Sequence, residues 1–386
     1  MKIRAITIGG EQSATLNTRI VTEGARVAMQ LAKVCEDEGI AVQTVRFATQ
    51  PFPQYLSACT EKELVQFALE LQHCCQDHGI DYCSLGPVNL YDPHEASLLA
   101  YLPRLIAETE SVFASAILGE SVHYISVKSA QAIARVIAQI AQATDGGFGN
   151  LRFAGLVNCP PHIPFFPAAF HSGAPAFAIA LEAADVIAAA CHPGLDFNEL
   201  HLSLRHAIET QVLPVQEVAT RFASPQFRYL GIDLSPAPGP EREGSIAYAL
   251  EHLGRGRFGE PGTLAAAAAV TAALRDTTLL TCGYCGLMLP VLEDAGLAER
   301  NNQGLLRLSS LLSYSAVCGT GLDTIPLPGD VSEEQLTAIL TDVASLGVKL
   351  NKPLSARLFP IPGKRAGEQT EFSFSYFVNT RVMPIA

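Results

Sequence analysis

Several acidic residues of this sequence lie inside otherwise apolar stretches, where their carboxylates could do chemistry. Glu182, Asp233 and Asp323 are the clearest cases. A buried carboxylate is costly unless it is paired, hydrogen-bonded or bound to a metal. We therefore predict these three as catalytic residues for proton transfer, and Asp323 with Asp330 as ligands of a divalent cation. For any single residue, a helix cap or an Arg or Lys partner is the better-supported explanation.

A second group of residues is suited to binding a small polar or anionic substrate. Residues 158–172 read NCPPHIPFFPAAFHS and follow an expected strand, at the end where parallel α/β proteins bind ligands. We predict that Phe166 and His171 of this proline-rich loop contact the substrate, although a loop that only packs its own aromatic rings has equal support. Lys352 and Arg357 are predicted to pair with the charge of the substrate.

The ten cysteines allow three interpretations. Cys282 and Cys285 have the spacing of a dithiol redox centre, but two small residues at a tight turn explain the pattern more simply. A zinc site is weaker, because no second pair with ligand spacing exists, although Cys318 could be a third ligand. Cys318 itself is predicted to act as a nucleophile or as a packing residue.

The composition excludes several classes of protein. Hydrophobic residues make up 48% and charged residues only 17%, which excludes disorder. The net charge of −12 repels nucleic acid and anionic lipid, and no apolar stretch is long enough to span a membrane. Because the cysteines lack a disulfide spacing and the first residues alternate like a strand, we expect a cytoplasmic protein without a secretion signal. The apolar composition predicts a homodimer.

Strand-like runs alternate with helical runs along the chain, which indicates an α/β protein with mainly parallel strands in one domain, residues 1–386. The stretch 176–191 is expected to form a buried helix. The expected strands cover residues 4–8, 42–46, 82–85, 112–117, 151–157, 228–234 and 278–281.

Five blocks of sequence resemble a widespread prokaryotic family known as domain of unknown function 711. They are NCPPHIPFFPAAFHSGAPAFAIALEAADVI at 158–187, GIDLSPAPGP at 231–240, GLMLPVLEDAGLAE at 286–299, SAVCGTGLDTIPLPGDVS at 315–332 and LGVKLNKPLSARLFPIPGKRAGEQTEF at 346–372. The resemblance implies a large, parallel-rich α/β barrel like that of pyruvate formate-lyase-like glycyl radical enzymes. It implies no assigned activity.

A glycyl radical mechanism is not expected for this chain. Such a mechanism passes a radical from a glycine near the C-terminus to a cysteine inside the barrel, and Cys318 is the candidate cysteine. However, Arg381-Val382 is followed by Met383-Pro384, and no glycine occurs after Gly367. We therefore predict an enzyme that uses acid/base or metal-assisted chemistry on a small molecule inside the barrel. A non-catalytic binding or regulatory protein and a thiol redox protein are the alternatives.

Overall fold

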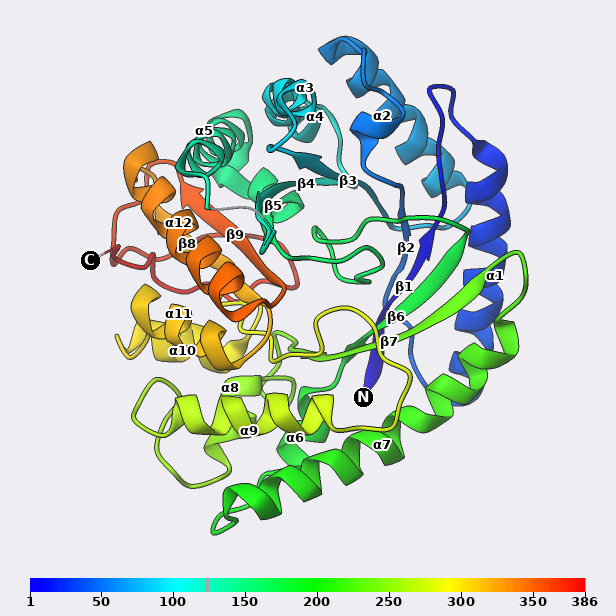
Figure 1. Ribbon diagram of the computed structural model, residues 1–386. Helices are drawn as coiled ribbons and strands as arrows, with labels where there is room; N and C mark the ends of the chain where they lie inside the picture. The colour runs from blue at the N-terminus through cyan, green and yellow to red at the C-terminus, as the bar shows by residue number, and fades with distance from the viewer. Residues whose placement is uncertain (123–124, 386) are drawn as a thin grey trace.

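One sheet of nine strands runs through the computed structural model, which describes residues 1–122 and 125–385 (Figure 1). The strand order is β7-β6-β1-β2-β3-β4-β5-β9-β8. All neighbouring pairs are parallel except β1 with β6 and β5 with β9. The strands are β1 (Lys2–Gly9), β2 (Val45–Ala48), β3 (Tyr82–Asn89), β4 (Val112–Gly119), β5 (Phe153–Val157), β6 (Ala176–Glu182), β7 (Arg228–Ala237), β8 (Gly321–Pro328) and β9 (Leu354–Ile361).

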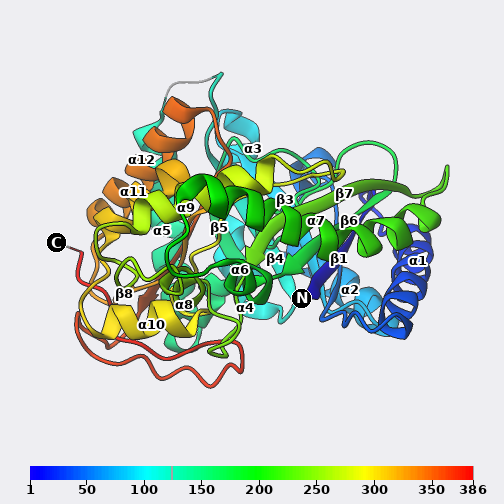
Figure 2. The ribbon, with the colours of Figure 1, turned by 90° about the horizontal axis from the view of Figure 1, so that it is seen from below.

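Helices cover the outer face of the sheet (Figures 1 and 2). Among the longest, α1 lies against β1 and β2, α7 against β7, and α12 against β4, β5 and β9. The α-helices are α1 (Thr18–Asp37), α2 (Glu61–Asp77), α3 (Pro93–Leu98), α4 (Leu102–Glu108), α5 (Val127–Ala143), α6 (Ala184–Ala190), α7 (Phe197–Phe222), α8 (Ile246–Glu251), α9 (Thr263–Arg275), α10 (Ala295–Asn302), α11 (Leu308–Val317) and α12 (Glu333–Leu350). The mixed α/β class predicted from the sequence is confirmed.

An irregular segment, residues 158–175, lies in the hollow of the curved sheet (Figure 1). Two hydroxyls on the inner face of the sheet hold it: Thr7 Oγ1 donates to the Pro164 carbonyl at 2.8 Å, and Ser84 Oγ donates to the Ala169 carbonyl at 2.7 Å. Because side chains alternate along a strand, the large residues of these strands face the helices instead. The small inner residues therefore leave room for this interior segment.

Gly9 shows how close the interior segment comes to the sheet. A Cβ atom at Gly9 would lie 2.2 Å from Nδ1 of His171, whose side chain is fully buried. Real Cβ atoms do not approach a neighbour so closely, so only glycine fits at the end of β1. The close contact fixes the position of the interior segment against the strand.

The sheet is open within the described residues, so the α/β barrel expected from the family resemblance is not confirmed. Within the described residues, the edge strands β7 and β8 do not pair with each other. Each edge instead forms one isolated bridge to the segment that connects α9 to α10: Ile232 with Thr281, and Asp323 with Pro290. The predicted strand at 278–281 is thus reduced to a single bridge.

The stretch 176–191 was expected to be one helix, and this prediction was wrong. Residues Ala176–Glu182 form β6, and only Ala184–Ala190 are helical. β6 is buried between β1 and β7, so it carries the continuous apolar run of a central strand, which periodicity alone does not distinguish from a buried helix. No helix among residues 1–122 and 125–385 has the length and apolar character needed to cross a membrane.

Candidate functional site

A pocket that is partly open to solvent lies inside the curve of the sheet, with an empty volume of about 920 Å³ when the open solvent at the pocket is counted. Its walls come from the first residues of β2, β3 and β4, from the turn of the interior segment at residues 165–168, and from β8 and β9. The pocket therefore lies at the N-terminal ends of β2 to β4. The sequence predicted a ligand site beyond the opposite ends of the strands.

The polar side of the pocket is built around Glu293. Its carboxylate accepts from Arg357 Nη2 at 2.7 Å and from Arg4 Nη2 at 3.0 Å. Arg357 Nε also donates to Asp323 Oδ1 at 2.6 Å. These side chains are only 10–14% exposed, so the ion pairs are shielded from bulk water.

Glu182 extends the same network away from the pocket. It accepts from Arg4 Nη1 at 3.2 Å and from the exposed Lys2 Nζ at 3.3 Å. The structure thus links Glu182 and Asp323, both predicted from the sequence, through Arg4, Glu293 and Arg357. Each of the two carboxylates has an arginine partner.

A β-bulge places Arg4 in the pocket. The register of β1 against β6 shifts between Ile3 and Ala5, so Arg4 is the extra residue of the pair. Thr7 faces the interior segment, and strict alternation would turn Arg4 to the opposite face. A bulge re-aims a side chain in this way, and Arg4 lines the pocket as a result.

Arg46 on β2 lines the pocket and is only 8% exposed. Its Nε donates to Thr44 Oγ1 at 2.9 Å, and its guanidinium carbon lies 5.6 Å from the Tyr82 ring centre and 5.3 Å from that of Phe166. In the part of the chain that the structure describes, no carboxylate forms an ion pair with it. Burial, followed by the nearby charge of Arg4, lowers the pKa of Arg46 to about 9.

Aromatic rings form the other side of the pocket. Phe113 packs edge-to-face against both Tyr82 and Phe166, with ring centres 5.5 and 5.1 Å apart. Phe166 was predicted to contact the substrate, and the structure places it in the pocket wall. The rings surround Arg46 with apolar surface.

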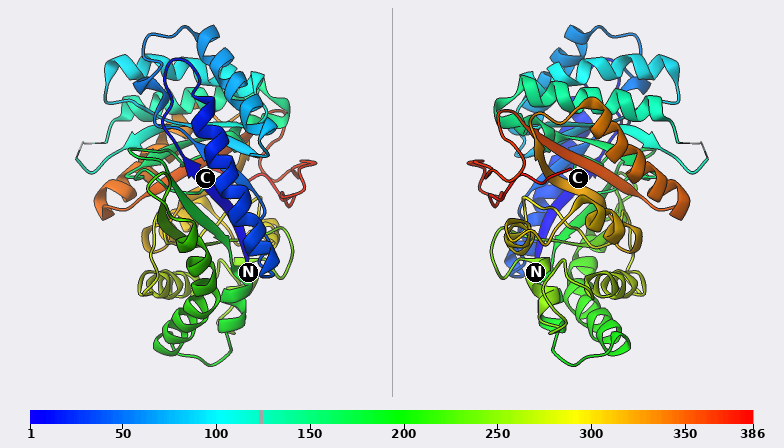
Figure 3. Two further views of the ribbon diagram at one scale, coloured as in Figure 1. Left: turned by 90° about the vertical axis from the view of Figure 1, so that its right-hand side faces the viewer. Right: turned by 90° about the vertical axis from the view of Figure 1, so that its left-hand side faces the viewer.

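The C-terminal segment, residues 362–385, supplies part of the pocket wall. Figure 3 shows this segment as a red loop projecting from one side of the molecule. Phe374 and Tyr376 line the pocket, and the Tyr376 ring centre lies 5.5 Å from the guanidinium carbon of Arg4. Next to them, Phe377 is buried against Phe359, with ring centres 5.6 Å apart, which anchors the segment.

Asp233 is separate from this network. It is fully buried and accepts hydrogen bonds from Ser235 Oγ at 2.7 Å and from the backbone amides of Ser235, Tyr284 and Cys285 at 2.7–3.0 Å. Burial raises its pKa, while these hydrogen bonds oppose the rise. Asp233 therefore holds the turn at residues 282–286, and the structure does not bring it together with Glu182 and Asp323.

The same carboxylate works against a redox role for Cys282 and Cys285. Burial and then the charge of Asp233 raise the pKa of both thiols, to about 12 for Cys285. A redox dithiol needs a stabilised thiolate, which requires the opposite shift. Both thiols are free, and Cys285 Sγ donates to the Cys282 carbonyl at 3.3 Å.

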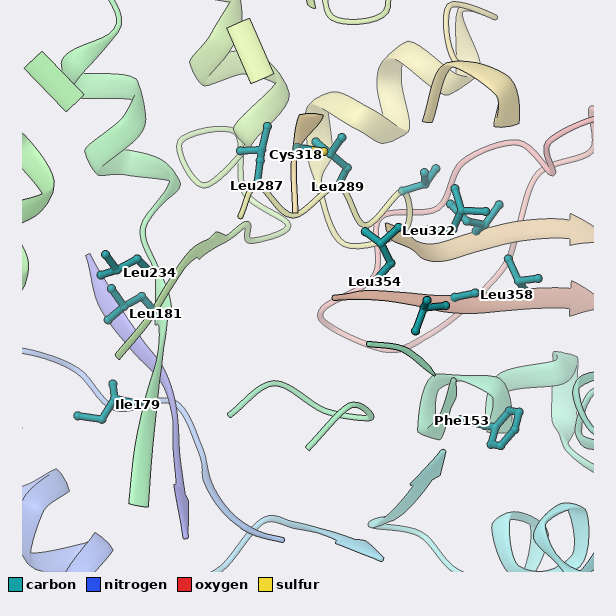
Figure 4. Close-up of a cluster of buried hydrophobic side chains, with 14 of the residues drawn as sticks. Phe153, Ile179, Leu181, Leu234, Leu287, Leu289, Cys318, Leu322, Leu354 and Leu358 are labelled. Atoms are coloured by element: carbon teal, nitrogen blue, oxygen red, sulfur yellow. The ribbon is translucent and has the colours of Figure 1, made fainter. Parts of the chain in front are cut away.

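Cys318 is a buried packing residue in the structure. Figure 4 shows its sulfur close to Leu287 and Leu289 in an apolar cluster, and it is 1% exposed. Burial raises the pKa of this thiol to about 12, which keeps it protonated. It does not line the pocket at Glu293.

Lys352 does not reach the pocket either. Its Nζ donates to the carbonyls of Ser315, Ala316 and Cys318, at 2.9 and 3.3 Å for the first two. These carbonyls lie at the C-terminal end of α11, where they have no partner within the helix and where a cation is favourable. Lys352 thus caps α11.

His171 lies behind the pocket, packed edge-to-face on His162 with ring centres 5.1 Å apart. Its Nε2 interacts with the Gly173 carbonyl at 2.7 Å, while its Nδ1 is buried without a hydrogen-bond partner. Burial lowers the pKa of both rings, to about 4 for His162. His171, predicted to contact the substrate, does not line this pocket, and its contacts lie within the interior segment and with Gly9 of β1.

The predicted pair of metal ligands is not brought together. Asp323 lies near the start of β8 and pairs with Arg357, whereas Asp330 is exposed beyond the end of the strand, roughly 20 Å away at the usual rise per residue. Among the described residues, no group of three or more His, Cys, Asp or Glu side chains could hold a metal ion.

The comparisons with known proteins assign the chain to a family. The family model described as Uncharacterised ACR (DUF711) matches residues 1–373. The chain belongs to the DUF711 family. It is 28% identical over 404 residues to a UPF0210 protein of Acetivibrio thermocellus, which covers 96% of this chain and 88% of the relative. A UPF0210 protein of Pyrobaculum arsenaticum is 30% identical over 353 residues, covering 87% of this chain and 77% of the relative.

Three pocket residues of this DUF711 protein were not predicted as site residues: Arg4, Arg46 and Glu293. Arg4 and Arg46 lie within or at the start of expected strands, where a charged residue in an apolar run is a recognisable signal. Glu293 follows the apolar run 287–292 and carries the same signal. The sequence pattern does not show that all three meet in one pocket, since they come from segments up to 289 residues apart.

Proposed function

We propose that this DUF711 protein binds a small organic anion in the pocket between Arg46, Glu293 and Arg357. The observation that carries the proposal is the buried guanidinium of Arg46, which faces the pocket without a carboxylate partner among the described residues. An unpaired buried charge is costly. An anionic ligand would supply the missing partner and would form charge-assisted hydrogen bonds with its open Nη atoms.

Catalysis on the bound anion is the second candidate function, and it keeps the acid/base chemistry predicted from the sequence. Asp323 and Glu293 line the same pocket as Arg46, so a ligand there lies beside two carboxylates. A carboxylate within hydrogen-bond reach of a bound ligand is a candidate general base. Asp233 and Cys318 have no place in this chemistry, because their contacts are made elsewhere.

We also propose that the fold is an open variant of the α/β barrel that the family resemblance to pyruvate formate-lyase-like enzymes implies. The two isolated bridges at Thr281 and Pro290 support it, because they connect both edges of the sheet to one segment. In this arrangement the interior segment 158–175 occupies the centre of the barrel.

The binding proposal is tested by thermal unfolding of the full chain in the presence of benzoate, acetate and inorganic phosphate. We expect at least one anion to raise the melting temperature of the wild type, since a ligand that binds only the folded state stabilises it. The Arg46→Met variant keeps the length of the side chain and removes its charge, and it should lose this response. Arg19→Met, on the exposed face of α1, is the matched control and should keep it. An equal response in both variants, or no response of the wild type to any anion, would overturn the proposal.

A further inference from the structure

The charges of the pocket indicate how many charges the ligand carries. Lys2, Glu182, Arg4, Glu293, Arg357 and Asp323 follow one another in a continuous series of ion pairs. Three cations and three carboxylates make this series neutral. Arg46 stands outside it: Glu293 and Asp81 act on its charge, but no carboxylate of the described residues forms an ion pair with it. The charged residues that line the pocket are Arg4, Arg46, Arg357, Glu293 and Asp323, so the lining holds one more cation than carboxylates.

The surroundings of Arg46 indicate how the anion meets it. The Nε of Arg46 donates its hydrogen bond to Thr44 Oγ1. The ring centres of Tyr82 and Phe166 lie within 5.6 Å of the guanidinium carbon. The two Nη groups have no hydrogen-bond partner among the described residues. They are not among the fully buried polar atoms that lack a partner, so they are open to the pocket. The edge carrying these two groups is the part of a guanidinium that binds a carboxylate through two parallel hydrogen bonds.

The remaining walls indicate the body of the ligand. Phe113 and Phe166 continue the wall beside Arg46, and Phe165, Met288 and Phe374 add further apolar surface. Aromatic rings prefer edge-to-face or offset contact with another ring. A sugar or a nucleotide carries many hydroxyl groups that this wall would leave without partners.

We propose that the ligand is an aromatic monocarboxylate, whose carboxylate binds the Nη groups of Arg46 and whose ring packs against Phe113 and Phe166. The inference rests on the proposed function, because it specifies the anion bound at the same site. It excludes dianions as the preferred ligands, since a second negative charge would meet the carboxylates of Glu293 and Asp323 without a free cation.

Isothermal titration of the full chain with a matched set of probes tests the inference. Benzoate and phenylacetate have both features, acetate lacks the ring, benzamide lacks the charge, and phthalate and inorganic phosphate carry additional charge. We expect benzoate or phenylacetate to bind at least about 10-fold more tightly than each of the other four. Tighter binding of phosphate or phthalate, or equal binding of acetate, would overturn the aromatic monocarboxylate while leaving the anion site intact.

Two variants separate the ring contact from the charge contact. Phe166→Leu should weaken benzoate about 10-fold and leave acetate unchanged, because only benzoate has a ring to pack on Phe166. Phe197→Leu, at an exposed position on α7, is the control and should change neither. An equal loss for benzoate and acetate in Phe166→Leu would show that the ring contact is absent. Failure of every anion to bind the wild type would instead reject the anion site itself.

Discussion

The Glu293 carboxylate and the Arg357 guanidinium form a 2.7 Å ion pair in which each side chain is only 10% exposed. Glu293 also pairs with Arg4, so one carboxylate offsets the charges of two largely buried arginines. Without it, two like charges would face each other in a site with little water. Glu293 is therefore required both for the stability of the pocket and for its charge.

Replacing Glu293 by Gln should change stability and anion binding in opposite directions. Breaking a buried ion pair costs about 3–5 kcal/mol, because the remaining charges lose their partner. At the same time the pocket gains a positive charge, so anions should bind more tightly and stabilise the variant more than the wild type. Urea unfolding with and without benzoate measures both effects.

The control for Glu293→Gln is Glu108→Gln, which removes an exposed partner of Arg104 and should cost less than about 1 kcal/mol of unfolding free energy. A loss no larger than that of the control would contradict the role of Glu293.

The general class of the fold could be predicted from the sequence, because strands and helices alternate and most strands carry runs of β-branched and aliphatic residues. β1, β3 and β4 were found near their true positions for this reason. β6 was mistaken for a helix because a strand buried on both faces has no alternation. The openness of the sheet depends on pairing between distant segments, which local patterns do not contain.

The candidate site could be predicted only in part. The sequence analysis selected Asp323 as a charged residue in an apolar run, Arg357 as a charge partner for a substrate and Phe166 from the proline-rich loop, and all three line the pocket. Whether such a residue faces a pocket or caps a helix depends on tertiary contacts. Lys352 and Asp233 were selected in the same way as Arg357 and Asp323, but they bind backbone groups. Arg4 was missed because a bulge, which leaves no clear mark in the sequence, turns it into the pocket.

Lys352→Met should destabilise the protein by about 2–3 kcal/mol. The change removes the ammonium group that donates to three carbonyls at the end of α11. A hydrogen bond to a charged group contributes about 1.5–3 kcal/mol to stability. Lys349→Met, at an exposed position in the last turn of α12, should change stability by less than about 0.5 kcal/mol. Chemical unfolding of the two variants gives the comparison. If anion binding fell in Lys352→Met at unchanged stability, Lys352 would be a ligand-binding residue after all.

Gly9→Ala should cost about 1–3 kcal/mol, because the added methyl group would overlap His171. Gly155→Ala is a suitable control, since its Cβ would make ordinary contacts at 3.5 Å. The double variant Gly9→Ala/His171→Ala should recover part of the loss, since the second change removes the overlapping ring. Unfolding free energies of these three variants and of the single variant His171→Ala measure the effect. A double variant whose loss equals the sum of the two single losses would show that the contact with His171 is not the cause.

The thiols of Cys282 and Cys285 should react slowly with iodoacetamide. At pH 8 a thiol with a pKa of about 12, as for Cys285, is ionised roughly 10³-fold less than an ordinary cysteine. Mass mapping of the folded protein should therefore find these two sites unmodified when the unfolded protein is fully labelled. Fast labelling, or a disulfide between them under mild oxidant, would restore the redox interpretation.

Acid should weaken the fold through His162. Its pKa is lowered from 6.5 to about 4, mainly by burial, so the unfolded chain binds a proton more readily than the folded chain between these values. The associated stability is fully present above pH 6.5 and is lost as the pH falls from 6.5 towards 4. The matched comparison is His162→Gln, which cannot titrate but keeps every carboxylate of the protein. Between pH 7.5 and pH 4.5, urea unfolding should show a loss of free energy that is larger in the wild type by about 1 kcal/mol, after allowance for the exposed part of the ring. Equal losses in the two proteins would mean that His162 is protonated in the folded state as easily as in the unfolded chain.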